Sequence, residues 1–89
     1  MTRMERVVIE EGGAAAHACG PEALFELGMI YCVGRDVHQD MVNAHKWFNL
    51  AAMRGNRQAL DYRREISREM TDLQIAAAQK TAREWLATH

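Results

Sequence analysis

From Pro21 onward, apolar residues recur every three or four positions along the chain, which is the spacing of one face of an α-helix. Glycines and capping residues interrupt this pattern, so it predicts four helices joined by short loops. No alternation of polar and apolar residues is long enough to predict a sheet. Because short loops join antiparallel neighbours, the sequence predicts an all-α fold made of antiparallel helical hairpins.

The residues that flank the first two predicted helices define where they begin and end. Pro21 suits the first position of a helix, and Gly34 stops the run that follows it. Asp40 is a good N-cap for the second helix, because its carboxylate accepts hydrogen bonds from the free amides of the next turn. Gly55 suits the left-handed backbone position that follows a helix end. The first two helices are therefore predicted between these markers.

The second half of the chain predicts two further helices. Asn56 can cap the third helix, which we expect to extend through Met70. Residues 71–74 fit a capping box, in which the Gln side chain reaches back to the cap amide, and the fourth helix runs from there towards the C-terminus. The N-terminal segment 1–20 is less defined, since its apolar residues fit a helix or a short strand before a short alanine-rich helix.

Small residues on the predicted helices lie beside large aromatic ones. Gly28 and several alanines share helix faces with Tyr31, Trp47 and Phe48. Small side chains let two helix axes approach closely, while aromatic rings fill the remaining space. We therefore expect close helix packing in the middle of the chain, beyond what the helix propensity of alanine alone would explain.

The order and spacing of these residues resemble one unit of the Sel-one-like repeat (SLR) family, α-solenoid repeats related to the tetratricopeptide repeats (TPR). The resemblance runs from residue 23 to residue 58, and the next unit would begin at residue 59. The matching positions are Ala23, Leu27, Gly28, Tyr31, Gly34, Val37, Asp40, Ala44, Trp47, Phe48, Ala51, Ala52, Gly55 and Ala59. The resemblance implies antiparallel helical hairpins stacked as a short SLR/TPR-like α-α superhelix.

The chain departs from the family pattern in two places. The family's loop usually has a glycine where this chain has Asp36, and we expect Asp to tolerate the left-handed backbone there. The pattern also fades after one unit, because the third helix begins like a repeat at Ala59 and then turns polar, as terminal solenoid units do. Residues 1–20 are thus interpreted as an N-terminal segment with a partial preceding unit, and residues 21–89 as one SLR hairpin plus a closing helical pair.

The size and charge of the chain narrow the classes of function. At 89 residues and 10.1 kDa, it supports one thin core with little room for a deep substrate pocket. Lys and Arg number 11 against 12 Asp and Glu, a net charge of −1, so we expect no nucleic acid partner. No apolar run is long enough to span a membrane or to form a signal-peptide core, so the expected location is cytoplasmic.

The two cysteines are expected to be reduced thiols. Cys19 and Cys32 flank a predicted helix, which would separate their Cα atoms by about 18 Å at the rise of an α-helix. A disulfide requires Cα atoms within about 7 Å of each other. We therefore expect no intramolecular disulfide, and Cys32 is interpreted as a small core residue.

The histidines and acidic residues predict neither a metal site nor a catalytic site. Asp36, His38 and Asp40 share one loop, but Asp40 is better explained as a helix cap, and no known zinc spacing is present. His45 is interpreted as a residue on a helix surface. The sequence contains no phosphate-binding glycine loop and no recognisable nucleophile–base pair, so we expect no cofactor.

The SLR resemblance implies a non-enzymatic adaptor or scaffold that binds another protein or a peptide. The concave surface of stacked hairpins would be lined by the first helix of each hairpin, and helical phase gives the candidates there. The candidate binding residues are Glu22, Phe25, Glu26, Met29, Tyr62 and Arg63. The alternative is a small hydrolase or a β-lactam-binding protein of the cysteine-rich SLR type, although this chain lacks that cysteine arrangement.

Two further hypotheses concern partners. Solenoids usually need about three repeats for stability, so the N-terminal segment or a second subunit must cover an open side, and a homodimer is possible. A third interpretation of the function is a structural remnant or a regulatory subunit that works only as an oligomer. The third predicted helix also carries an arginine-rich polar face. We interpret this face as solvated, with ion pairs between residues i and i+4, and the alternative is a contact with an acidic partner. Its residues are Arg63, Arg64, Glu65, Arg68 and Glu69.

Overall fold

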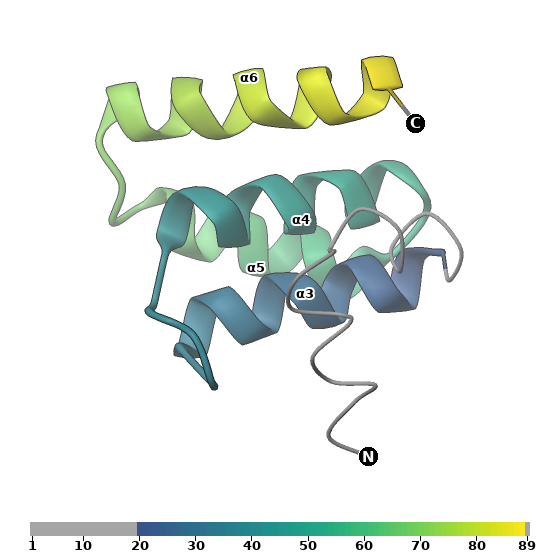
Figure 1. The fold of residues 1–89 in the computed structure, drawn as a ribbon, viewed down its shortest axis with the longest axis horizontal. Coiled ribbons are helices and arrows are strands. Elements are labelled where there is room, and N and C mark those ends of the chain that lie inside the picture. Colours follow the sequence, from purple (N-terminus) through teal and green to yellow (C-terminus); the bar gives the residue numbers. More distant parts are fainter. Residues whose placement is uncertain (1–19, 89) are drawn as a thin grey trace.

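A computed structural model of the chain describes residues 20–88, and within them it consists of four helices and no strand. The helices are α3 (Pro21–Val33), α4 (Met41–Met53), α5 (Arg57–Ser67) and α6 (Asp72–Thr88). The chain reverses direction at each connection, so consecutive helices run antiparallel (Figure 1). The predicted all-α class is confirmed for this part of the chain, whereas the partial preceding unit and Cys19 lie outside the described residues.

The ends of α3 and α4 form at the predicted markers. Pro21 is the first residue of α3, and Gly34 follows it in the left-handed conformation with φ of 76°. The Gly34 amide donates to the carbonyl of Ile30 at 2.9 Å, which satisfies one of the free carbonyls at the helix end. Asp40 caps α4, because its Oδ1 accepts from the backbone amide of Asn43 at 3.1 Å.

The loop between these helices adopts the backbone that the sequence predicts. Asp36 has φ of 65°, so it occupies the left-handed region in place of a glycine. The loop also covers the end of α3, since the amide of Asp40 donates to the carbonyl of Tyr31 at 3.0 Å. The side chain of Gln39 donates to the carbonyl of Cys32 at 2.8 Å. These bonds fix the start of α4 against the end of α3.

Side-chain caps also start α5 and α6. Asn56 accepts from the amide of Ala59 at 2.8 Å. Thr71 Oγ1 accepts from the amide of Gln74 at 3.1 Å, and Gln74 Oε1 accepts from the amide of Thr71 at 2.8 Å, so the capping box is confirmed. The predicted end of α5 at Met70 is wrong, because α5 ends at Ser67 and the chain continues in tighter turns that bond each amide three residues back.

Helix α4 lies at the centre of the fold and packs against α3, α5 and α6. In Figure 1, α3 and α6 lie on opposite sides of α4. The buried apolar residues are Leu24, Leu27, Ile30, Ala44, Trp47, Phe48, Leu50, Ala51, Ala59, Ile66, Met70, Ala78, Ala82 and Trp85. None of the helices between residues 20 and 88 has both the length and the apolar character needed to cross a membrane.

Small and aromatic residues meet across α4 as the sequence predicts. Gly28 of α3 faces the ring of Phe48, where an added Cβ would overlap the ring carbons. On the α6 side, Trp47 and Trp85 meet edge to face, with ring centroids 5.8 Å apart and planes at 81°. Close approach on one side and an aromatic pair on the other hold α4 between its neighbours.

Candidate functional site

The six candidate binding residues lie on α3 and α5, and both of these helices pack against the Phe48 side chain of α4. Glu22, Phe25, Glu26 and Met29 are on α3, while Tyr62 and Arg63 are on α5. Because the chain reverses at each loop, α3 and α5 run in the same direction (Figure 1). They meet where the Phe25 and Tyr62 rings lie 5.6 Å apart at 57°.

Phe25, Phe48 and Tyr62 form one aromatic cluster that joins α3, α4 and α5. The Phe48 ring is fully buried and lies 5.8 Å from Phe25 and 5.5 Å from Tyr62, with the Tyr62 plane inclined by 25°. Tyr62 remains 37% exposed. Phe25 is half-buried, because α5 lies beside it, so much of its ring belongs to the core and only part of it faces solvent.

The remaining α3 candidates lie around this cluster. Glu22 and Glu26 are exposed and one turn apart, and Glu22 occupies the first turn, where a negative charge suits the helix dipole. Glu26 Oε1 lies 3.7 Å from Arg35 Nη2, and both side chains are about 60% exposed, so this ion pair contributes little to stability. Met29 is half-buried and packs against the core. The α3 surface beside the aromatic cluster is therefore acidic.

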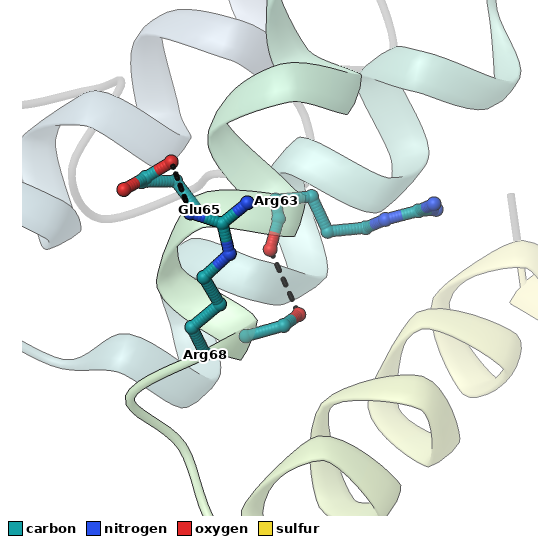
Figure 2. A network of polar contacts seen from close by, with 4 residues as sticks. Arg63, Glu65 and Arg68 are labelled. Carbon is teal, nitrogen blue, oxygen red and sulfur yellow. Dashed lines mark hydrogen bonds and ion pairs between the residues drawn. The ribbon is translucent and has the colours of Figure 1, made fainter.

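Arg63 belongs to a different part of the structure from the other five candidates. Its Nη1 donates to Asn49 Oδ1 of α4 at 2.6 Å, and its side chain is half-buried. Consecutive residues of a helix point about 100° apart, so Tyr62 packs on Phe48 and Phe25 whereas Arg63 bonds to Asn49. Figure 2 shows the Arg63 side chain extending away from the Glu65–Arg68 pair. Arg63 thus joins α5 to α4, and the structure does not bring it together with Phe25 and Tyr62.

The polar face predicted for α5 is present in part. Arg68 and Glu65 form an exposed ion pair at 3.4 Å, with spacing i,i+3 instead of the predicted i,i+4 (Figure 2). An i,i+4 pair occurs on α6, between Lys80 and Glu84 at 4.0 Å. Pairs as exposed as these are worth at most a few tenths of a kcal/mol.

His45 is the largest difference between the sequence prediction and the structure. It was predicted on a helix surface, but it is 3% exposed and is the buried polar residue of the described chain. Its Nε2 lies 3.0 Å from Ser67 Oγ, at the end of α5. The two residues are 22 positions apart, so no local pattern in the sequence signals the contact.

A serine hydroxyl beside a histidine nitrogen suggests a nucleophile and its base, but the proton positions differ here. Ser67 Oγ donates its single proton to the carbonyl of Arg63 at 2.8 Å, a common bond of serine within a helix. With that proton on the carbonyl, the hydroxyl accepts from His45, and Nε2 is assigned as the protonated nitrogen of the ring. A protonated Nε2 cannot take a proton from Ser67, and the contact acts as a bond between α4 and α5.

The thiol and the acidic residues show no arrangement for metal binding. Among residues 20–88, no three His, Cys, Asp or Glu side chains gather closely enough to hold an ion. Cys32 is a half-buried free thiol, and burial together with the nearby Glu69 carboxylate raises its pKa. The thiol therefore stays protonated at neutral pH, which makes it a poor nucleophile.

Comparisons of the chain with protein-family models, with curated proteins and with solved structures found no significant match. The SLR resemblance therefore rests on the residues themselves.

Proposed function

We propose that this protein is a non-enzymatic protein–protein interaction module, an adaptor or scaffold built on a Sel-one-like repeat. In this proposal, α3 and α4 are the hairpin of one repeat, and α5 and α6 are the closing pair that stacks on it as in a short TPR-like superhelix. Three features support the proposal: the close crossing at Gly28 and Phe48, the Asp40 cap, and the left-handed backbone at Asp36.

The observation that carries the proposal is the position of Tyr62. Its ring stacks on the buried Phe48 ring and touches Phe25, yet more than a third of the residue remains exposed. Rigid, partly exposed aromatic side chains are favoured anchors in protein interfaces, because little side-chain entropy is lost on binding. Tyr62 and Phe25 would form the centre of the binding surface, and Glu22 and Glu26 its edge.

Charge gives the kind of partner that this surface fits. The carboxylates of Glu22 and Glu26 are exposed on α3, and Glu26 has one cationic neighbour, Arg35. A peptide with a large apolar residue flanked by Lys or Arg would place its apolar group on Tyr62 and its cations beside the carboxylates. The partner proposed is therefore a basic segment of another protein.

The alternative of a small hydrolase or a β-lactam-binding protein would need an activated nucleophile. The closest arrangement to one within residues 20–88 is Ser67 with His45, and there the histidine donates instead of accepting. The Cys32 thiol is held protonated. No observation favours this alternative, and turnover of a chromogenic β-lactam by the protein would establish it.

A random-peptide library selected against the immobilised full-length protein tests the proposed surface. We expect the enriched peptides to combine an aromatic or long aliphatic residue with Lys or Arg. Their affinity should fall about two- to fivefold at low salt for the Glu22→Gln/Glu26→Gln double variant, whose side chains are exposed and whose loss leaves the core intact.

A matched control is Leu73→Ala, because Leu73 is a large apolar residue that is 83% exposed and belongs to α6, the helix that carries none of the six candidate residues. This variant should bind the selected peptides as the natural chain does. Absence of enrichment, or equal binding by the natural chain and the Glu22/Glu26 variant, would contradict the proposed surface.

A further inference from the structure

We infer that His45 makes the packing of α4 against α5 acid-sensitive, so that protonation of its buried imidazole separates these two helices. The inference goes beyond the proposed function and does not depend on any partner. It rests on the hydrogen-bond geometry around the ring, on burial, and on the charges that surround it.

The hydrogen bonds fix where a second proton would have to go. Ser67 gives its hydroxyl proton to the Arg63 carbonyl, so His45 Nε2 is already the protonated nitrogen of the neutral ring. Acid must therefore protonate Nδ1. Among the described residues, Nδ1 is buried and has no hydrogen-bond partner. An N–H formed at that atom would be a buried donor without an acceptor, which is costly.

The charges around His45 also oppose a cation. Burial first, and the charge of Arg63 on α5 second, lower the pKa of His45. On α4 itself, the neighbouring Lys46 is a further cation, with Nζ 4.1 Å from the Trp47 ring centre. The buried side chains that α3 and α6 pack against α4 do not ionise near neutral pH; they are Leu24, Leu27, Ile30, Ala78, Ala82 and Trp85. The buried residues of these helices thus bring no carboxylate to balance a charge on His45.

The direction of the pH dependence follows from these groups. In the unfolded chain His45 has an ordinary histidine pKa of about 6.5. In the folded chain its pKa is lower, so below about pH 6.5 the unfolded state binds more protons than the folded state. The full stability is present above this pH and is lost progressively as the pH falls through the folded-state pKa. The helix first affected is α5, since His45 contacts Ser67 there and Arg63 binds Asn49 beside it.

Urea unfolding of the full chain between pH 7.5 and pH 5 measures this effect. As the pH is lowered, the folding equilibrium constant of the natural chain should decrease. The decrease should approach tenfold per pH unit, because one proton is involved. His45→Gln should lack this component, because its amide can donate to Ser67 and does not titrate. His38→Gln should keep it, because His38 is exposed in the loop before α4. Other ionisable groups are common to all three proteins and cancel in the comparison.

Side-chain NMR of the natural chain keeps the inference testable if His45→Gln does not fold. We expect the His45 ring to stay neutral, with the proton on Nε2, at about pH 6.5, where a histidine of ordinary pKa is half protonated. Equal slopes for the natural chain and His45→Gln would overturn the inference. So would a His45 ring that is half protonated at this pH, or one that carries its neutral proton on Nδ1.

Discussion

Replacing Gly28 with alanine tests the close crossing of α3 and α4, on which both the fold and the proposed binding surface depend. Gly28 is buried in α3 and faces Phe48. An added Cβ would overlap two carbons of the Phe48 ring, and that ring is fully buried. The rings of Phe25 and Tyr62, at 5.8 and 5.5 Å, restrict where Phe48 could move.

Two effects of opposite sign decide the outcome of this substitution. Alanine is the better helix former, so in the interior of an unobstructed helix it would stabilise the protein by about 1 kcal/mol relative to glycine. Overpacking a close-packed core by one methyl group costs about 1–3 kcal/mol. Because the Cβ meets a ring held between two others, we expect overpacking to prevail. The expected net loss is up to about 2 kcal/mol, and each kcal/mol lowers the Tm by about 4–8 °C for a domain of this size.

Urea unfolding followed by circular dichroism measures this loss for Gly28→Ala. A double-mutant cycle with Phe48→Leu separates the collision from other effects, because leucine lacks the ring carbons that the Cβ would meet. In the Phe48→Leu background, Gly28→Ala should cost less than it does in the natural chain. A natural-background Gly28→Ala that is more stable than the parent would refute the close crossing.

Two predictions concern the α3–α4 loop, and each is measured as a change in the free energy of unfolding in urea. Asp40→Ala removes the side-chain cap of α4 and should destabilise the protein by about 1 kcal/mol, whereas Asp61→Ala, at an exposed position within α5, should change it little. At position 36, where φ is 65°, Asp36→Gly should be at least as stable as the natural chain, and Asp36→Ala should be less stable than Asp36→Gly by about 1 kcal/mol. An alanine as stable as glycine there would contradict the left-handed backbone.

The starts of the four helices and the ends of α3 and α4 could be predicted from the sequence because the interactions that set them are local. A cap bonds an amide three residues away, as Asn56 does with Ala59, and a left-handed residue such as Gly34 acts on its own turn. The end of α5 escaped prediction for the opposite reason. The apolar spacing continues to Met70, which is indeed buried, but the last turn tightens, and sequence spacing alone does not distinguish the two kinds of turn.

The candidate site was predicted less well, because burial of a polar residue depends on a distant partner. His45 looks like an ordinary surface residue until α5 brings Ser67 beside it. Arg63 likewise stands in a charged stretch that is typical of a solvated helix face, yet it bonds to Asn49 across the α4–α5 contact. Phe25 lies beside Tyr62, as expected of two residues on one surface. The contacts of His45 and Arg63 could not be predicted from helical spacing, because each partner comes from another helix.

The three sides of α4 connect the surface to the acid-sensitive contact. The Phe48 ring packs against the rings of Phe25 and Tyr62. His45 contacts α5, and Trp47 contacts α6. Tyr62 is carried by α5, whereas Phe25 belongs to α3, which packs closely on α4 where Gly28 meets Phe48. Loss of the His45 contact would therefore withdraw Tyr62 and leave Phe25 in place. The proposed binding surface needs both rings. Protonation of His45, which lies outside this surface, would therefore disrupt it.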